Sequence, residues 1–454
     1  MKTKALILAA GQGTRMKSEQ SKVLHKVFDK ALVEYPILAA KHVGVQEICM
    51  IIGHKAEEVQ KALGNTVSYV LQKEQLGTGH AVMQAIDFID EDGEVLILYG
   101  DTPLITGETL EKMINFHRTN KNGATVLSAV VDDPSGYGRI VRDKAHKFTK
   151  IVEQKDATDT EKQIPEINGG MYVFEAALLK YALSQLTNNN VQKEYYLTDT
   201  LEILLAKGHK VDAVPSESVE DILGVNSREQ LAEVTDIMKQ RINSKHMVQG
   251  VTLVDPQNTY IGSSVVIGRD TVIEPGCILE GNTQIGEACR IGYHSKIKNT
   301  TIGNHVDIEI SVITDSFIDE GTHVGPFAYL RPHSHIGKNI KIGDFVEIKN
   351  ATIGDGTKVS HLTYIGDADV GKGVNFGCGT VVVNYDGEKK HRTTVKDNAF
   401  IGCNTNLVAP VIVEEGAYTA AGSTITRTVP KDSLAIARAK QENKEEWVTK
   451  KRKK

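Results

Sequence analysis

The sequence predicts two domains of different class, an α/β domain followed by an all-β solenoid. The length of 454 residues exceeds the roughly 250 to 300 at which a single core usually stops growing. Short β-branched runs alternate with helical stretches up to about residue 225, whereas beyond residue 250 aliphatic residues recur every six positions. We therefore expect a first domain at residues 1–227, a linking helix at 228–249 and the solenoid at 250–454.

The composition excludes several classes of function. Hydrophobic residues make up 40% and charged residues 24%, as in soluble globular proteins. The net charge of -5 gives no general footprint for nucleic acid, and no stretch approaches the roughly 20 apolar residues of a membrane span. We expect neither nucleic acid nor a membrane as partner, and we expect the basic run at residues 450–454 to be solvated and disordered.

The five cysteines are scattered and include no Cys-x-x-Cys pair. This pattern indicates neither a disulfide framework nor a zinc knuckle. We therefore expect a reducing compartment and a cytoplasmic location.

Five β-branched or apolar runs predict the strands of the first domain. Helical stretches separate them, and this alternation favours a parallel or mixed sheet that is covered by helices. The runs are residues 5–10, 48–52, 95–99, 125–131 and 171–174.

The segment from Arg228 to about His246 predicts the linking helix, because apolar residues at Leu231, Val234, Ile237 and Met238 alternate with charges.

The six-residue period fits neither a helix nor a lone strand, but it fits a solenoid in which three hexapeptide faces close one coil. Residues 250–430 would form on the order of ten such coils. The period slips to five at a few places, such as Ile297 to Ile302, where we expect a corner to lack one residue. Between Val383 and Val395 the pattern is lost, which predicts a loop ejected from the stack, and such loops often carry function.

A glycine-rich loop follows the first predicted strand and contains Gly11, Gly13 and Arg15. Glycines let backbone N–H groups approach phosphates or a base edge, and Arg15 adds a fixed positive charge. Neither the dinucleotide fingerprint nor the P-loop pattern fits this loop.

Asp101 follows the strand at residues 95–99 and so lies at the carboxyl edge of the sheet, where ligands bind. A carboxylate there suits Mg²⁺, which takes few protein ligands and keeps water and phosphates for the rest. The alternative is a helix N-cap before Thr102.

Ordered blocks along the first domain resemble the signature of sugar-1-phosphate nucleotidylyltransferases. They are LAAGQGTRM from Leu8, SKVL from Ser21, LQKEQLGTGHA from Leu71, YGDTP from Tyr99, GYGRI from Gly136, IVEQ from Ile151, NGG from Asn168 and GVN from Gly224. With the hexapeptide half, the resemblance covers nearly the whole chain. The whole chain resembles a bacterial family of bifunctional N-acetylglucosamine-1-phosphate uridyltransferases and glucosamine-1-phosphate acetyltransferases.

This resemblance implies a Rossmann-like α/β nucleotidyltransferase domain and a left-handed parallel β-helix acetyltransferase domain. It implies acetyl transfer from acetyl-CoA to glucosamine-1-phosphate, then Mg²⁺-dependent uridylyl transfer from UTP to N-acetylglucosamine-1-phosphate. The product, UDP-N-acetylglucosamine, serves peptidoglycan synthesis. A homotrimer is implied by resemblance alone.

The resemblance also assigns residues to the first site. Arg15 and Lys22 would neutralise phosphates during catalysis, and Asp101 and Asn226 would hold Mg²⁺. For Glu153 a plain surface carboxylate is the alternative. The residues expected to bind nucleotide and sugar are Leu8, Ala9, Ala10, Gly11, Lys22, Gln72, Gly77, Thr78, Gly138, Glu153, Asn168 and Asn226.

In the solenoid, the block VSHLTYIGDA from Val359 resembles the acetyltransferase block in which the histidine is the general base, here His361. An imidazole with a pKa near 6.5 suits removal of a proton from a sugar ammonium. Arg331 and Lys349 each follow an inward aliphatic residue, so we expect both to face outward on neighbouring coils and clamp a sugar phosphate.

Other positions match the family's contacts to the acetyltransferase substrates. Tyr364 and Asn375, with Arg331 and Lys349, would bind the sugar substrate. The acetyl-CoA positions are Cys378, Asn384, Tyr385, Cys403, Ala421 and Arg438.

Two of these positions depart from the family pattern, where Ala is frequent at Cys378 and Ser at Cys403. The second change replaces a hydroxyl by a weaker S–H donor, which puts cofactor affinity in doubt.

Two other functions are compatible with parts of the sequence. One is a single-activity sugar-1-phosphate nucleotidylyltransferase with a structural or regulatory solenoid. The other is a non-catalytic binding protein built on the same two folds. His361, Lys349 and Arg331 argue against the first, and Arg15, Lys22 and Asp101 argue against the second.

Overall fold

The computed structural model describes residues 2–452 and divides into two compact units between Met238 and Lys239. Among the described residues, no helix combines the length and apolar character that crossing a membrane would need.

The first unit is built on a nine-stranded sheet with the order β11-β7-β10-β6-β1-β4-β5, and a hairpin of β8 and β9 beside β10. The pairs of β1 with β4 and β6 are parallel, whereas β10 runs antiparallel to both β6 and β7. The sheet is therefore mixed. Its strands are β1 (Thr3–Ala9), β4 (Ile48–Ile52), β5 (Ser68–Leu71), β6 (Glu94–Tyr99), β7 (Ala124–Val130), β8 (Arg139–Arg142), β9 (Phe148–Val152), β10 (Glu166–Glu175) and β11 (Val211–Pro215), and β2 (Lys26–Val27) pairs separately with β3 (Lys30–Ala31).

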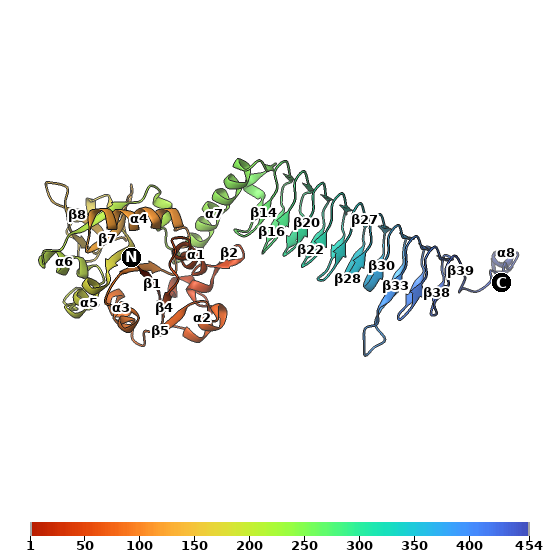
Figure 1. Ribbon diagram of the computed structural model, residues 1–454, viewed down its shortest axis with the longest axis horizontal. Helices are drawn as coiled ribbons and strands as arrows, with labels where there is room; N and C mark the ends of the chain where they lie inside the picture. Colours follow the sequence, from red (N-terminus) through yellow and green to blue (C-terminus); the bar gives the residue numbers. More distant parts are fainter. Residues whose placement is uncertain (1, 453–454) are drawn as a thin grey trace. The chain divides into compact units, whose positions relative to one another are not determined.

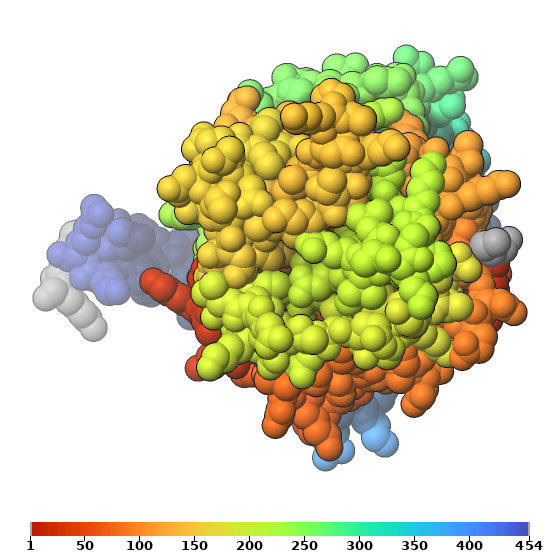
Figure 2. Space-filling model, turned by 90° about the vertical axis from the view of Figure 1, so that its left-hand side faces the viewer, coloured from red at the N-terminus to blue at the C-terminus, as the bar shows by residue number. Residues whose placement is uncertain are grey.

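Helices cover both faces of this sheet, because β1 is apolar at every position from Ala5 to Ala9. Ala5, Ile7 and Ala9 pack into one core, and Leu6 and Leu8 pack into the other. The first core includes residues of α1 (Glu34–His42), α2 (Ala56–Leu63) and α4 (Gly107–Asn120). The second includes residues of α3 (Thr78–Gln84), α5 (Ala176–Ser184) and α6 (Asp199–Ala206). In the space-filling view, yellow and yellow-green segments, which include β8, β9, α5 and α6, form much of the facing surface (Figure 2).

The five predicted strands are confirmed as β1, β4, β6, β7 and the second half of β10. The helix predicted from Arg228 is present as α7 (Arg228–Val248), and the division between the two units falls within it. Its first half packs into the first unit, where Val234 is buried. In its second half, the Asn243 side chain donates to the backbone oxygens of Pro256 and Thr259 in the second unit.

The second unit is a parallel β-helix, as the six-residue period predicts. Each strand pairs with the strand one coil ahead, and the coils stack regularly (Figure 1). One sheet has eleven strands, close to the expected ten coils: β12 (Thr252–Leu253), β15 (Val272–Ile273), β18 (Arg290–Ile291), β21 (Asp307–Ile308), β24 (His323–Val324), β27 (Lys341–Asp344), β29 (Lys358–His361), β31 (Asn375–Phe376), β34 (Phe400–Ile401), β37 (Tyr418–Thr419) and β39 (Leu434–Ala435).

The other faces form a seventeen-stranded sheet: β13 (Tyr260–Ile261), β14 (Val266–Ile267), β16 (Ile278–Glu280), β17 (Gln284–Ile285), β19 (Lys296–Lys298), β20 (Thr301–Ile302), β22 (Val312–Thr314), β23 (Phe317–Ile318), β25 (Tyr329–Leu330), β26 (His335–Ile336), β28 (Glu347–Ile353), β30 (Tyr364–Val370), β32 (Val381–Val383), β33 (Thr393–Val395), β35 (Asn406–Val408), β36 (Ile412–Val413) and β38 (Thr424–Ile425).

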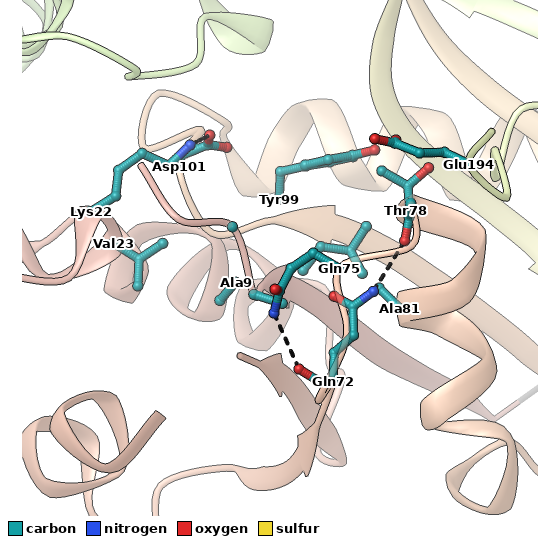
Figure 3. Close-up of a pocket in the computed structure, with 14 residues that line it drawn as sticks. Ala9, Lys22, Val23, Gln72, Gln75, Thr78, Ala81, Tyr99, Asp101 and Glu194 are labelled. Atoms are coloured by element: carbon teal, nitrogen blue, oxygen red, sulfur yellow. Dashed lines mark hydrogen bonds and ion pairs between the residues drawn. The ribbon is translucent and has the colours of Figure 1, made fainter. Parts of the chain in front are cut away.

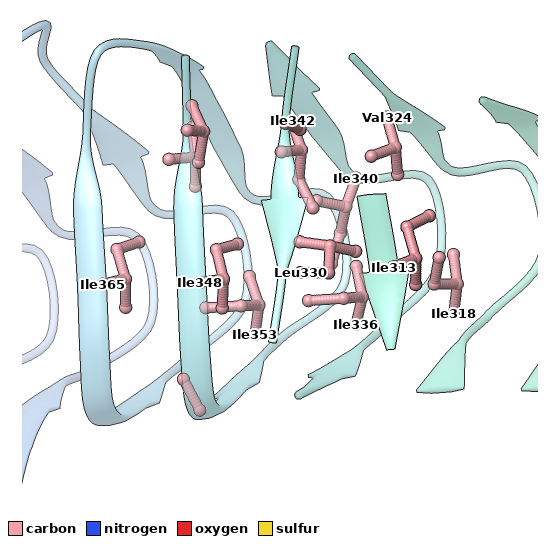
Figure 4. Close-up of a cluster of buried hydrophobic side chains, with 14 of the residues drawn as sticks. Ile313, Ile318, Val324, Leu330, Ile336, Ile340, Ile342, Ile348, Ile353 and Ile365 are labelled. Carbon is pink, nitrogen blue, oxygen red and sulfur yellow. The ribbon is translucent and has the colours of Figure 1, made fainter. Parts of the chain in front are cut away.

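The repeating aliphatic residues form the core of the stack (Figure 4). Where the period slips, Ile297 and Ile302 are both buried, so the inward column resumes after the shortened corner. The predicted loop leaves the stack just before β33 (Figure 1).

The expectation of a disordered tail is wrong for part of it. Trp447–Arg452 forms a short exposed helix, α8, in which Lys450 forms an ion pair with Glu446, the residue before the helix. Residues 453 and 454 lie outside the described residues.

Candidate active sites

Lys22 packs closely against the backbone of the glycine-rich loop that follows β1. Gly13 has φ +63°, and a Cβ atom there would lie 2.6 Å from the Cβ of Lys22. Any larger residue at position 13 would therefore be strained and would push Lys22 away.

Lys22 meets two other predicted residues from distant parts of the chain. Its Nζ lies 2.5 Å from Oδ2 of Asp101 and 3.0 Å from Oδ1 of Asn226. The backbone fixes this approach, because the Val225 N–H donates to the Asp101 carbonyl oxygen at 2.8 Å. Two oxygens thus converge on one cation, and they belong to the two residues expected to hold the metal.

A cavity of about 270 Å³ opens beside this cluster (Figure 3). Lys22 and Asp101 lie together on one side of it, and Gln72 and Gln75 lie at another. Of the predicted residues, Leu8, Ala9, Ala10, Gly11, Lys22, Gln72, Gly77, Thr78 and Asp101 line this cavity.

Gln72 is buried at the wall of the cavity, and contacts with neighbouring residues fix the nitrogen of its side-chain amide. Its Nε2 donates to the Gly77 carbonyl oxygen at 3.2 Å and lies 3.1 Å from Nδ1 of His80. These contacts turn Oε1 away from both partners, so this oxygen can accept a hydrogen bond from a ligand.

A second cavity of about 370 Å³ shares Tyr99 and Asp101 with the first. Arg15, Asn168 and Asn226 also line it. Asp101 therefore stands where two ligands could meet.

Gly138 and Glu153 are not among the residues that line either cavity, but Gly138 adjoins both Glu153 and Asn168. A Cβ atom on Gly138 would lie 3.4 Å from Oε2 of Glu153 and 3.5 Å from Cβ of Asn168. Burial raises the pKa of Glu153, and the Thr198 hydroxyl donates to its carboxylate at 3.2 Å. Glu153 is therefore not a plain surface carboxylate.

His361 lies at a corner of the β-helix with 60% of its side chain exposed, not inside the stack. Its Nδ1 lies 2.8 Å from Oδ1 of Asp344, which occupies the matching position of the preceding coil. The pKa of Asp344 is lowered chiefly by this hydrogen bond.

The coil register places several predicted residues in one line with His361. The pairs of Val359 with Phe376 and of Tyr364 with Val381 keep the same register on both sides of His361, which therefore faces Cys378. The pairing of β31 with β34 and of β34 with β37 continues this line. We call it the His361 column; its members are Asp344, His361, Cys378, Cys403 and Ala421.

Positive charge gathers beside the column. The Arg331 N–H donates to the carbonyl oxygen of Ile348, so Arg331 lies next to Lys349 of the next coil. The pKa of Lys349 is lowered, first by a hydrogen bond with Lys390 of the ejected loop and then by burial. The Glu347 carboxylate lies 2.7 Å from the Arg331 guanidinium and balances its positive charge.

The ejected loop is tied to the stack through Asn384, whose Nδ2 donates to the Asp367 carboxylate and lies 3.4 Å from the Tyr364 hydroxyl. Tyr385 is exposed in the same loop. The structure thus brings Tyr364, Asn384, Lys349 and Arg331 together.

Two predicted residues remain to be placed. Asn375 is on β31, where it pairs with Lys358 and Phe400. Arg438 follows β39, and its Cδ lies 3.8 Å from where a Cβ atom of Gly422 would be.

Sequence reasoning missed Asp344, Lys390 and His80. Asp344 stands one shortened coil before His361, and that spacing was the available signal. Lys390 was visible only as charge in a polar loop. His80 lies in the block LQKEQLGTGHA, but its contact with Gln72 needs the turn before α3.

Comparison with known proteins follows the two halves of the chain. The family described as nucleotidyl transferase matches residues 4–250, and the family of bacterial transferase hexapeptides (six repeats) matches residues 264–299. The chain is 54% identical to the "Bifunctional protein GlmU" of Alkaliphilus metalliredigens, over 99% of both chains. It is 56% identical to that of Acetivibrio thermocellus, over 98% of this chain and 97% of the relative. It is 54% identical to that of Clostridioides difficile, over 100% and 99%.

Proposed function

The chain belongs to the family of the bifunctional GlmU proteins, and on that premise we propose how its residues divide between two transferase reactions. It is a bifunctional uridyltransferase and acetyltransferase that makes UDP-N-acetylglucosamine for peptidoglycan synthesis. We assign uridylyl transfer to the cavities beside Asp101 and acetyl transfer to the surface beside His361.

The pair of adjoining cavities carries the first assignment. UTP would occupy the cavity lined by Gln72 and the peptide groups of Ala10 and Gly11, and N-acetylglucosamine-1-phosphate the cavity lined by Asn168. Asp101 lies at the shared wall, where the sugar phosphate oxygen would attack the α-phosphorus as pyrophosphate leaves.

Positioning and charge neutralisation are the chief demands of this reaction, because both substrates are anions. Arg15 lines the sugar cavity and Lys22 the nucleotide cavity, so each supplies positive charge on one side of the reacting phosphates.

Asp101 and Asn226 fit a magnesium site, because both present an oxygen to the same cation, the Lys22 ammonium. Hard oxygen ligands in small number are what Mg²⁺ takes when phosphates complete its shell. When bound, Mg²⁺ would neutralise charge on the phosphates.

The Asp344–His361 pair carries the second assignment. An Nδ1–H donated to Asp344 leaves Nε2 of a neutral imidazole as the proton acceptor. His361 would take a proton from the ammonium group of glucosamine-1-phosphate, which leaves the neutral amine. The amine would then attack the thioester carbonyl of acetyl-CoA, and CoA would leave as the thiol.

The three cations beside His361 suit the sugar phosphate. The positive charges of Lys349 and Lys390 repel one another, and an anion bound between the two side chains would relieve this repulsion. Acetyl-CoA would lie along the rest of the His361 column, past Cys378 and Cys403 to Ala421 and Arg438.

An exposed apolar ridge supports the homotrimer. Phe327 and Phe345 stack at 5.5 Å on successive coils, and they are 53% and 58% exposed. Leu362, which follows His361, extends the ridge and is 59% exposed. We propose that neighbouring copies cover this ridge and complete the acetyl-transfer site. The five free cysteines fit the proposed cytoplasmic location.

Separate knock-outs test the two assignments. Asp101→Ala should lower metal-dependent pyrophosphate release by roughly 100- to 1,000-fold and spare thiol release from acetyl-CoA. His361→Ala should do the reverse, by roughly 100-fold or more. Asp87→Asn, an exposed carboxylate on the first unit, is the control. Loss of both activities from either change would contradict the two-site assignment.

A further inference from the structure

The five cysteines fall into two groups. Cys49, Cys277 and Cys289 are buried, and burial raises the pKa of Cys49 and Cys277 to about 11. Cys378 is half-buried and Cys403 is exposed. Because the thiolate is the reactive form, a mild thiol reagent should select the second group.

Cys378 and Cys403 occupy the same position on successive coils. The Gly377 N–H donates to the Ile401 carbonyl oxygen at 2.7 Å, and the Asn404 N–H donates to that of Cys378 at 2.8 Å. Each cysteine precedes a corner residue with positive φ, Gly379 at 74° and Asn404 at 55°. Matching turns after β31 and β34, on neighbouring coils, direct both side chains to the same side.

The spacing of the two cysteines fits a disulfide. Neighbouring strands lie about 4.8 Å apart, and disulfides join Cα atoms roughly 4.4–6.8 Å apart. A cross-link would therefore need side-chain rotation and little movement of the backbone. Parallel stacking of the coils fixes this proximity, because hydrogen bonds hold the backbone on both sides of each cysteine.

We propose that Cys378 and Cys403 form a dithiol modification site that small disulfides oxidise to an intramolecular disulfide, which stops acetyl transfer. One thiolate attacks a disulfide such as oxidised glutathione, forms a mixed disulfide and releases one glutathione thiol. The second thiolate attacks the bound sulfur, closes the Cys378–Cys403 bond and releases the other thiol. The two cysteines lose two electrons and two protons, and the small disulfide gains them.

The effect on activity follows from the place of the pair in the His361 column. This step rests on the proposed function, in which acetyl-CoA lies over Cys378 and Cys403. A disulfide would pull both sulfur atoms together and remove the S–H donors from that surface. Uridylyl transfer depends on residues of the other unit and should continue.

The test treats the full-length protein with oxidised glutathione, then removes the reagent. Intact mass should fall by about 2 Da, and peptide mapping should join Cys378 to Cys403. Acetyl transfer should fall by roughly 100-fold, as expected when an organised site is displaced by about 1 Å. It should return with dithiothreitol, while uridylyl transfer stays unchanged throughout.

Cys378→Ala and Cys403→Ser provide the matched variants, each compared with its own untreated activity. Neither variant should form the cross-link, so oxidised glutathione should not reduce its acetyl transfer through a disulfide between these two positions. The proposal is overturned if the wild type gains only glutathione adducts, if another pair is joined, or if the cross-linked protein still transfers acetyl groups. A protein that forms the cross-link but never transfers acetyl groups would instead disprove the proposed function and leave the dithiol site standing.

Discussion

Asp344 shows how a residue of one coil can fix the state of a base in the next. Its carboxylate accepts from Nδ1 of His361, and this contact selects the tautomer with Nε2 unprotonated. The pKa of Asp344 is lowered by that bond, so the carboxylate is ionised wherever the enzyme works near neutral pH. In the proposed function, Asp344 is thus a positioning residue for acetyl transfer.

Asp344→Ala should lower kcat for acetyl transfer by about tenfold, a part of what a general base contributes. KM for acetyl-CoA should change little, because Asp344 acts on the orientation of His361. Asp344→Asn keeps an oxygen that can accept from Nδ1 and should retain most of the activity. Steady-state kinetics of the two variants would check this, and equal loss in both would contradict a role in orientation.

Asp199, the first residue of α6, has a pKa raised from 3.8 to about 6, chiefly by burial and then by the negative charges of Glu202, Glu153 and Asp156. The folded state therefore keeps its proton to higher pH than the unfolded state. Stability from this group is present below its unfolded pKa and is lost as pH rises through the folded value.

Asp199→Asn should remove that loss and stabilise the first unit by about 1 kcal/mol near neutral pH, after allowance for solvent screening. At about pH 4 the variant and the parent should be nearly equal. Urea midpoints across this pH range would measure the difference, with Asp87→Asn as the exposed control. A constant difference at all pH values would refute the proposed titration.

The sequence was most informative about individual residues that lie in recognisable blocks. It predicted that Lys22, Asp101 and Asn226 act together, and their oxygens and nitrogen do meet. It could not pair Lys349 with Lys390, because that contact depends on the path of a loop whose pattern breaks the repeat.

At the scale of elements, the loop between β32 and β33 is clamped at its base. Arg392 donates two hydrogen bonds to the Asp369 carboxylate, at 2.6 and 2.5 Å. It also donates to the carbonyl oxygens of Asn350 and Ala368, at 3.2 and 3.1 Å. This fork sets where Lys390 stands relative to Lys349.

Arg392→Ala should raise KM for glucosamine-1-phosphate by roughly tenfold, because a looser loop holds Lys390 less firmly. Arg392→Lys keeps the charge but not the planar fork and should fall between. Acetyl-transfer kinetics at varied sugar phosphate would show the order. An unchanged KM in Arg392→Ala would show that the contacts of Arg392 do not contribute to binding of the sugar phosphate.

The solenoid was predictable as an element because its period is read directly from the chain. Even the shortened corners followed, since the aliphatic column resumes after them. The hairpin of β8 and β9 and the edge strands β5 and β11 were not among the predicted strands. Their burial patterns are mixed, as in β9 with only Phe148, Ile151 and Val152 buried, so the sequence gives a weak signal.

For the whole molecule, the division within α7 bears on how the chain can be cut. The proposed boundary at 227 removes Val234, which is buried in the first unit, together with Leu231, Ile237 and Met238, which pack beside it. A fragment ending at 238 keeps these contacts. The helix therefore belongs to both units rather than linking them passively.

A fragment of residues 1–227 should be less stable than one of residues 1–238 by about 1.5 kcal/mol or more, the value of burying one aliphatic side chain. Both fragments would be unfolded in urea and assayed for pyrophosphate release. Equal midpoints would show that the first half of α7 adds nothing to this unit.

The β-helix also has a weak end. β39 is the last strand in the described part of its sheet. Its residue Leu434 is 60% exposed, and Ile436, which follows the strand, is 63% exposed. In a stack where each coil contacts only its neighbours, local unfolding begins at such an end and spreads inward. Cys403 and Ala421 lie close to that end. In the proposed function, warming should therefore weaken acetyl-CoA binding before other properties of the unit, and bound acetyl-CoA should in turn stabilise the last coils against unfolding.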